Sequence, residues 1–132
     1  MIIGIGTDLV SFQHFKKNVT KTPALIERVF TEKEKQAANR LSGPRKIAYY
    51  AKRFAAKEAL SKACGTGIGH DISWQDMEIL NDEKGAPMAI LSPKALRFLQ
   101  KKFHTKNVTP FVSLTDEDQF AAAFAILTKE SK

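Results

Sequence analysis

The sequence predicts a single α+β domain in which an antiparallel sheet packs against one long central helix. Its 132 residues, of which 43% are hydrophobic, suffice for one hydrophobic core and are too few for two comfortable domains. No internal repeat, low-complexity tract or linker divides residues 1–132. The longest helix-forming segment begins at Ser42-Gly43-Pro44 and continues without glycine or proline to Gly65, and strand-like segments precede and follow it.

Residues 2–10 form the first expected strand. Their side chains alternate, so that one face of the strand carries Gly4, Gly6 and Asp8. The two glycines leave that face without side chains, which allows another backbone or a ligand to come close. We therefore expect a bare face that ends in a carboxylate.

Three shorter helices are expected before the long one. The first covers roughly residues 11–17, and the second runs from Thr22-Pro23 to Phe30, because threonine caps a helix and proline suits its first turn. The third begins at Thr31, which forms a capping box with Glu34, and ends near Leu41.

After the long helix, the pattern changes to strands. Met77–Leu80 and Pro87–Leu91 predict a hairpin, and Ser92-Pro93 caps a basic amphipathic helix of about ten residues. Two final strands are expected at about 108–115 and 119–128.

The charge of the chain is distributed unevenly. The net charge is +7, and residues 1–69 hold 13 Lys or Arg against 5 Asp or Glu, whereas residues 70–132 hold 8 against 9. Such asymmetry points to an anionic partner, which could be a nucleic acid, a polyphosphate cofactor, a membrane surface or an acidic protein.

Composition also excludes several classes of protein. Cys64 is the single cysteine and cannot form an internal disulfide, and three histidines do not make a structural zinc site. No apolar run is long enough to span a bilayer, and the chain does not begin with a signal-peptide pattern. We therefore expect a cytoplasmic protein that does not bind membranes.

The long helix combines an apolar stripe with a charged face. Residues placed at about 100° intervals put small residues on the stripe that faces the core, namely Ala55, Ala56, Ala59, Leu60 and Ala63. The opposite face carries Phe54, Glu58, Ser61 and Lys62. Glu58 and Lys62 alone could be an ordinary surface pair four residues apart.

A two-carboxylate site arises if the bare strand face meets the charged face of the helix. Asp8 and Glu58 would then lie together, with Arg53, Lys57 and Lys62 around them. Mg²⁺ is usually held by one or two carboxylates together with substrate phosphates and waters, and nearby cations neutralise the remaining phosphate charge. The arrangement suits a complex of a metal ion with a pyrophosphate.

The glycine-rich loop at 65–69 is not a standard nucleotide-binding loop. It follows a helix instead of joining a strand to a helix, and it lacks the ending of a P-loop. Gly65 is explained as the cap at the helix C-terminus.

Two motifs together resemble the signature of the holo-acyl-carrier-protein synthases, a family of 4'-phosphopantetheinyl transferases. The first is Gly4-Ile5-Gly6-Thr7-Asp8-Leu9, and the second is the segment from Arg53 to Ala63 with the loop at 65–69. The resemblance continues through Gly85-Ala86-Pro87, similar to the family's tight turn near the adenine, and through Val112-Ser113-Leu114-Thr115. It covers nearly the whole chain.

The resemblance implies an enzyme that moves 4'-phosphopantetheine from coenzyme A to a serine of an acidic apo acyl carrier protein, releasing 3',5'-ADP, in support of fatty acid biosynthesis. It implies the 4'-phosphopantetheinyl transferase fold and a homotrimer whose active sites lie between subunits. Asp8 and Glu58 would hold Mg²⁺ against the pyrophosphate, and Lys62 would complete the catalytic group by reaching the phosphates. Further contacts with coenzyme A are expected from Arg45, Arg53, Lys57, Ser61, Gly65, Gly85 and Pro87.

One position departs from the family pattern. Family members commonly carry a histidine shortly after the Val-Ser segment, where this chain has Asp116. Neither His70 nor His104 falls in that register, so the role of the histidine does not transfer to this chain.

Two readings from other classes remain open at this stage. A sequence pI near 9.6 is compatible with a small nucleic-acid-binding protein. However, Phe supplies nine of the twelve aromatic residues, mostly at core-like positions, and no RNA-binding motif is present, so we expect no nucleic-acid partner. The second alternative is a scaffold without catalysis that binds an acidic helical protein through Lys16, Lys17, Lys21 and Arg28.

Overall fold

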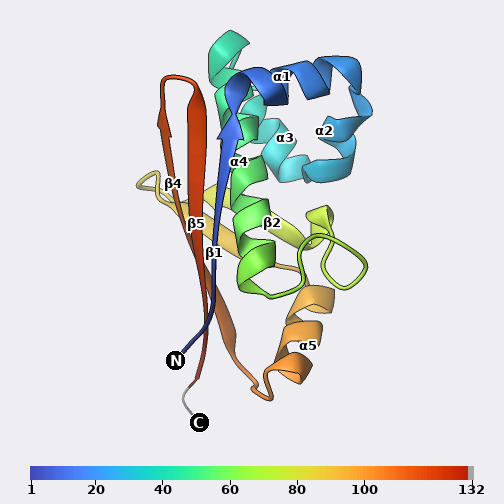
Figure 1. Cartoon of the computed structure of the whole chain (residues 1–132), viewed down its shortest axis with the longest axis vertical. Coiled ribbons are helices and arrows are strands. Elements are labelled where there is room, and N and C mark those ends of the chain that lie inside the picture. Colours follow the sequence, from blue (N-terminus) through green and yellow to red (C-terminus); the bar gives the residue numbers. More distant parts are fainter. Residues whose placement is uncertain (131–132) are drawn as a thin grey trace.

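A three-stranded antiparallel sheet with the long helix α4 (Gly43–Ala63) across one face forms the centre of the structure (Figure 1). The strands are β1 (Ile2–Ser11), β4 (Val108–Glu117) and β5 (Phe120–Lys129), in the order β1-β5-β4. The computed structural model describes residues 1–130 of the chain. The predicted α+β class, with an antiparallel sheet against a long central helix, is confirmed.

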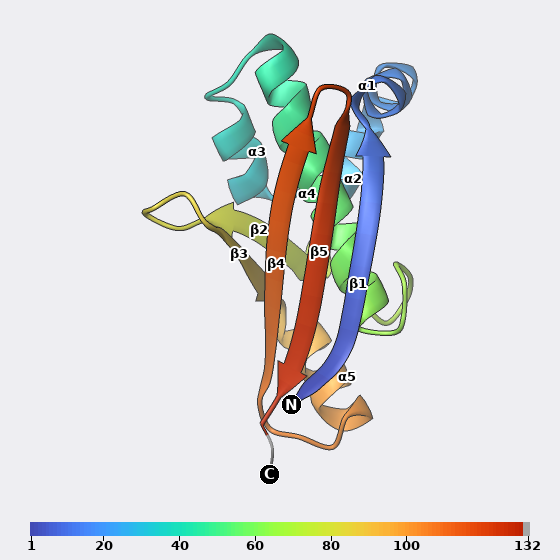
Figure 2. The same cartoon turned by 60° about the vertical axis from the view of Figure 1, so that its left-hand side comes forward.

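A separate hairpin lies beside the β4 edge of the sheet, and a last helix follows it. Strands β2 (Met77–Asn81) and β3 (Pro87–Leu91) pair antiparallel, and Figure 2 shows that their turn projects on the side of β4, away from β1. Helix α5 (Pro93–Lys102) follows, capped by the Ser92 hydroxyl, which accepts from the Ala95 amide. The predicted hairpin and basic helix are thus confirmed.

Three short helices form a layer on the other side of α4. They are α1 (Phe12–Lys21), α2 (Ala24–Val29) and α3 (Glu32–Ala38), and a 3-10 turn, η1 (Trp74–Asp76), lies against α2. Helix α1 continues four residues beyond its expected end at residue 17. The capping box of Thr31 and Glu34 is present as predicted. Among residues 1–130, none of the helices combines the length and the hydropathy needed to cross a bilayer.

Helix α4 is packed on two sides. Its alanine stripe is buried against the sheet, as expected for Ala55, Ala59 and Ala63. A second core cluster joins its N-terminal half to the short helices, with Phe15, Phe30 and Tyr50 among its members. The helix therefore has little free surface along most of its length.

The two glycines of β1 allow the strand to approach α4 very closely. A Cβ atom added at Gly4 would lie 1.8 Å from the Ala63 carbonyl oxygen, and one added at Gly6 would lie 1.9 Å from that of Ala59. No heavy atom fits at such distances, so these positions require glycine. The bare face of the strand meets the alanine stripe of the helix, which corrects the expectation that it would meet the charged face.

This contact predicts that Gly4→Ala and Gly6→Ala each lower the free energy of unfolding by about 1–3 kcal/mol or more, because the added methyl group meets rigid backbone. Chemical denaturation measures the change. Gly69→Ala is the control, since nothing lies within 4 Å of a Cβ at that position, and it should change stability by less than about 0.5 kcal/mol. Equal effects at the three positions would contradict the close packing.

Candidate active site

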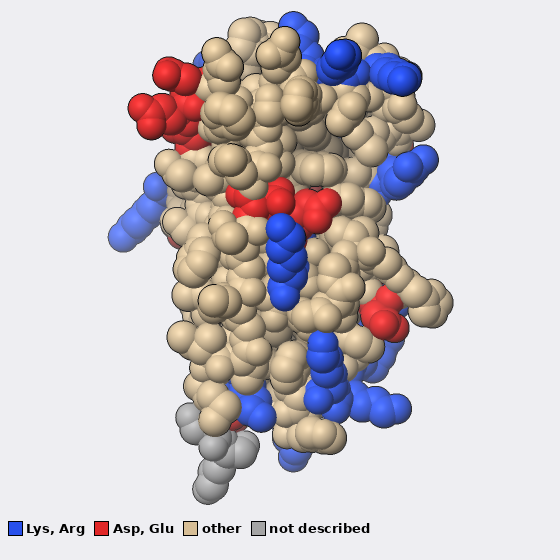
Figure 3. Space-filling view, in the orientation of Figure 1, with Lys and Arg blue, Asp and Glu red and all other residues tan. Residues whose placement is uncertain are grey.

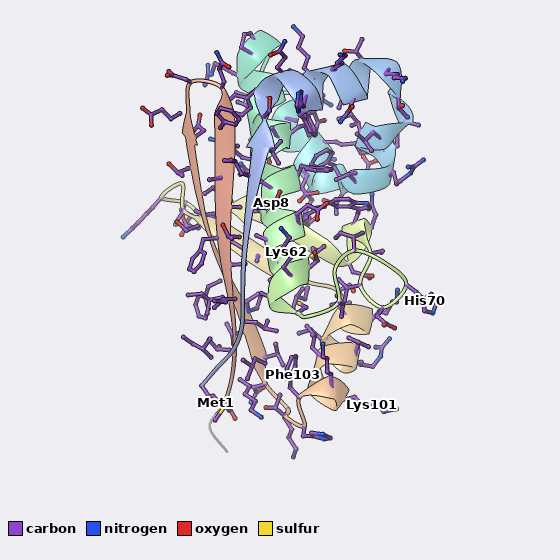
Figure 4. All side chains as sticks on the ribbon, in the orientation of Figure 1. Met1, Asp8, Lys62, His70, Lys101 and Phe103 are labelled. Carbon is purple, nitrogen blue, oxygen red and sulfur yellow. The ribbon has the colours of Figure 1, made fainter. Side chains whose placement is uncertain are left out.

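The close approach of β1 to α4 brings Asp8, Glu58 and Lys62 together at mid-height of one face. The Lys62 ammonium lies 3.2 Å from a carboxylate oxygen of Asp8 and donates to the Thr7 carbonyl at 3.0 Å. Figure 4 labels Asp8 and Lys62 on neighbouring elements, and Figure 3 shows acidic side chains directly above a lysine at this place. Lys62 of α4 therefore forms an ion pair with Asp8 of β1. From the sequence alone, Lys62 could have formed an ordinary surface pair with Glu58 on the same helix.

Asp8 and Glu58 line one cavity of about 340 Å³. Helices α1 and α2 supply other parts of its wall, including His14, Phe15 and Leu25. Burial raises the pKa of Glu58, the nearby Asp8 carboxylate raises it further, and Lys62 opposes the rise. The structure therefore assembles the two-carboxylate arrangement that the sequence predicted.

The donor set fits a hard divalent cation. Asp8 and Glu58 offer carboxylate oxygens in a cavity that is partly open to solvent. Within residues 1–130, no group of three or more Asp, Glu, His or Cys residues gathers as potential metal ligands. Two carboxylates, with waters and substrate phosphates completing the shell, match the usual surroundings of Mg²⁺.

Lys57 does not belong to this site. Its side chain is completely buried, and its ammonium donates to Glu34 at 2.7 Å, to the Val29 carbonyl at 2.6 Å and to the Trp74 carbonyl at 3.1 Å. Burial lowers the pKa of Lys57, and the Glu34 carboxylate opposes the fall. Internal acceptors thus occupy the Lys57 ammonium, and the expected contact of this residue with coenzyme A stays a prediction.

Ser61 does not lie where the helical wheel placed it, and Arg53 does not lie beside the carboxylates. Ser61 is buried, and its hydroxyl donates to the Glu58 carbonyl at 2.8 Å. Arg53 is 3% exposed, lies 3.9 Å over the ring of Tyr49 and donates to Asn81 at 2.6 Å, so it points toward the hairpin and away from Asp8. The outward orientation of Ser61 is wrong, and Arg53 does not surround the two carboxylates.

The expected contacts on the hairpin lie apart from Asp8 within one chain. Gly85 and Pro87 belong to the hairpin beside β4, at the opposite edge of the sheet from β1. Gly85 has a φ of +87°, as its turn requires. Gly65, with a φ of +77°, follows the end of α4 as the expected cap.

Arg45 lines a different and larger cavity, of about 820 Å³, at the N-terminal end of α4. Asp116, which stands where a histidine is expected, lines the same cavity and lies 3.5 Å from the Lys52 ammonium. Arg45 and Lys52 are seven residues apart and so share the face of α4 that is turned toward Asp116 of β4. The basic residues expected to bind anionic groups are therefore divided between two regions.

Some cavity residues were not identified from the sequence. His14, Phe15 and Leu25 line the cavity beside the carboxylates, but they lie on helices whose orientation no local pattern specifies. Phe54 also lines the cavity. The sequence could have indicated this, because the helical wheel places Phe54 on the same face as Glu58.

Comparisons with known proteins agree with this architecture. The family model for the 4'-phosphopantetheinyl transferase superfamily matches residues 4–125. The chain is 40% identical over 131 residues to the holo-[acyl-carrier-protein] synthase of Exiguobacterium sibiricum, covering 99% of this chain and 92% of the relative. It is 44% identical over 127 residues to that of Listeria monocytogenes, covering 96% and 98%.

Solved structures give the same result. The crystal structure of the Bacillus anthracis holo-(acyl-carrier-protein) synthase in complex with CoA (3',5'-ADP) has a TM-score of 0.83 at 36% identity, with 98% of this chain and 99% of that chain covered. The Neisseria meningitidis synthase has a TM-score of 0.83 at 35% identity, with coverage of 98% and 100%. The chain therefore belongs to the 4'-phosphopantetheinyl transferase superfamily, and within it to the holo-acyl-carrier-protein synthases.

The pKa of Glu58 should depend on the neighbouring Asp8 carboxylate. Because Asp8 raises the pKa of Glu58, Asp8→Asn should lower that pKa toward its ordinary value in metal-free buffer, as followed by carboxyl NMR. A raised acid pKa means that the folded state binds the proton more tightly, so stability falls as pH rises through the folded pKa of Glu58. That fall should be smaller in Asp8→Asn. An unchanged or higher Glu58 pKa would show that the carboxylates do not interact.

The buried ion pair makes a separate prediction. Lys57→Met leaves the fully buried Glu34 unpaired, which should cost about 3–5 kcal/mol of unfolding free energy. The double variant Lys57→Met with Glu34→Gln should regain part of that loss, because no buried charge remains. Denaturant titration measures both. If the refolded double variant lost its affinity for coenzyme A, the structural role assigned to Lys57 would be contradicted.

Proposed function

We propose that this chain transfers 4'-phosphopantetheine from coenzyme A to a serine of an acidic apo acyl carrier protein, giving the holo carrier protein and 3',5'-ADP. The observation that carries the proposal is the meeting of Asp8, Glu58 and Lys62 in and beside one cavity. The relatives of the chain also support the proposal. They are holo-acyl-carrier-protein synthases, and the structure of one of them was solved in complex with CoA (3',5'-ADP). Fatty acid biosynthesis in the cytoplasm is the setting that this reaction would serve.

Asp8 and Glu58 are the residues that would hold Mg²⁺. When bound there, the ion would neutralise negative charge on the pyrophosphate of coenzyme A. Lys62 is half exposed, and its long side chain can leave Asp8 to contact a phosphate oxygen. These residues would fix the pyrophosphate for attack in line with its leaving group.

The transfer itself needs a proton acceptor. The serine oxygen of the carrier protein forms a bond to the β-phosphorus, the bond from that phosphorus to the bridging oxygen breaks, and 3',5'-ADP leaves with the bond electrons. Glu58 would accept the serine proton directly or through a water molecule.

The division of the site residues supports the homotrimer with active sites between subunits that the family resemblance implies. One chain presents Asp8 at the β1 edge and the hairpin turn with Gly85 at the β4 edge, so a second copy would be needed to bring the two regions together. The outer face of the sheet supports such an assembly, since it exposes large apolar side chains. These are Ile5, Leu9, Phe111, Phe120 and Phe124.

A basic surface on the short helices fits an acidic carrier protein. Lys16, Lys17, Lys21 and Arg28 are all exposed on α1 and α2, and basic side chains are visible over this part of the molecule in Figure 3. Opposite charges would steer the carrier toward the cavity, which these helices flank. The alternative of a noncatalytic binding protein for nucleic acid or an acidic partner has no support from the comparisons.

Mass spectrometry of the carrier protein tests the proposed reaction. Incubation with coenzyme A, Mg²⁺ and an apo acyl carrier protein should add about 340 Da to the carrier, the mass of the arm moved by phosphoryl transfer. Asp8→Asn and Glu58→Gln should each abolish the transfer, while circular dichroism shows an intact fold. Chelation of Mg²⁺ should do the same to the wild type.

Gln36→Glu, a change on the exposed surface of α3, serves as the control and should retain transfer. Near-normal activity in either carboxylate variant would contradict the role given to that residue. Loss of folding in both would instead identify Asp8 and Glu58 as structural residues.

The trimer makes its own prediction. Light scattering should give three times the 14.7 kDa chain mass for the wild type at micromolar concentration. Phe124→Lys should give monomers, because it places a charge at the centre of the apolar sheet face. Thr20→Lys adds the same charge on exposed α1 and should leave the assembly intact. A monomeric wild type would rule out the model of an active site between subunits.

A further inference from the structure

The C-terminal end of helix α2 is held by side chains from other elements. The side-chain amide of Gln75, in η1, lies 3.0 Å from the Glu27 carbonyl, 3.4 Å from that of Arg28 and 2.8 Å from that of Phe30. Helix C-termini expose carbonyl groups without partners inside the helix. The two N–H groups of this amide can bond the Glu27 and Phe30 carbonyls, and the Arg28 carbonyl lies at the limit of their reach.

Lys57 completes the arrangement. Its ammonium donates to the Val29 carbonyl at 2.6 Å, so that four consecutive carbonyls, from Glu27 to Phe30, face donors from outside the helix. We refer to the Gln75 and Lys57 side chains as the α2 clamp. A cation and an amide donor are both favourable at the negative end of a helix dipole.

Helix α2 depends on such contacts for its position. It has six residues, and its N-cap, Pro23, offers no side-chain hydrogen bond. Helices this short are not stable in isolation, so their tertiary contacts determine their orientation. Buried Val29 anchors the end of the helix in the core, and the clamp fixes the carbonyls around that anchor.

The orientation of α2 matters because the helix connects the cavity with the basic surface. Leu25 lines the cavity that contains Asp8 and Glu58, and Arg28, one turn further along, is exposed among the residues expected to meet the carrier protein. A rotation of α2 would displace both side chains together.

We propose that Gln75 is a positioning residue for docking of the carrier protein. It holds α2 through its C-terminal carbonyls, and α2 in turn presents Arg28 to the carrier and Leu25 to the cavity. Gln75 is exposed and is not part of the cavity wall, so it acts through α2 and not on the reacting groups. This inference rests on the proposed carrier protein substrate.

Gln75→Glu is the sharpest test, because it keeps the side-chain size and replaces the donor amide by a carboxylate that repels the carbonyls. The KM for the carrier protein should rise several-fold, while the KM for coenzyme A and the midpoint of thermal unfolding stay close to wild type. The amides of α2 should exchange with solvent faster, since local opening becomes easier.

Gln36→Glu is the matched control. Gln36 is exposed on α3, and its side chain makes no hydrogen bond to another residue in the range 1–130. Gln36→Glu adds the same negative charge as Gln75→Glu. A comparison of the two variants therefore isolates the effect of losing the Gln75 amide. Gln75→Ala gives the same test without a new charge, and it decides the question if Gln75→Glu does not fold.

The outcomes separate the inference from the proposed function. If the wild type modifies the carrier protein and the Gln75 variants raise its KM no more than Gln36→Glu does, the positioning role is wrong. If the wild type modifies no carrier protein, the proposed function fails, and the docking role fails with it. Hydrogen exchange of the α2 amides would still test the clamp in that case. If these amides exchanged at the same rate in the Gln75 variants as in the wild type, Gln75 would not hold the helix.

Discussion

The contact between β1 and α4 is the constraint on which the candidate site depends. The Ala59 and Ala63 carbonyls lie where the Cβ atoms of any residues other than glycine at Gly6 and Gly4 would have to be. Because the strand lies directly on the helix backbone, Asp8 reaches the level of Glu58 and Lys62. A wider spacing would separate the two carboxylates and remove the effect of Asp8 on the pKa of Glu58.

The opposite side of α4 is fixed by polar contacts. Lys57 and Glu34 form a fully buried ion pair, and Glu34 also accepts from the Thr31 and Ile79 amides. Such a pair is costly to break because its partner would stay buried and charged. The helix is thereby held between the sheet and the layer of short helices. Glu58, which follows Lys57 directly, is carried on a rigid support.

The sequence predicted the parts of this arrangement that local patterns control. Alternation in β1, the alanine stripe of α4 and the capping box at Thr31 were each read correctly, because each depends on neighbours within a few residues. The helical wheel failed for Ser61, because it assumes one buried side and α4 has two. Nothing local shows that Glu34 would meet Lys57.

Our central proposal is that the β1–α4 contact builds half of an active site, which the hairpin of a second copy would complete. Co-expression of Glu58→Gln and Gly85→Val chains with different tags tests it, since each variant damages a different half. Trimers that contain both chains should regain carrier modification that neither variant shows alone, because some interfaces combine two intact halves. If purified mixed trimers stayed as inactive as each variant alone, the site would lie within one chain and the account would be wrong.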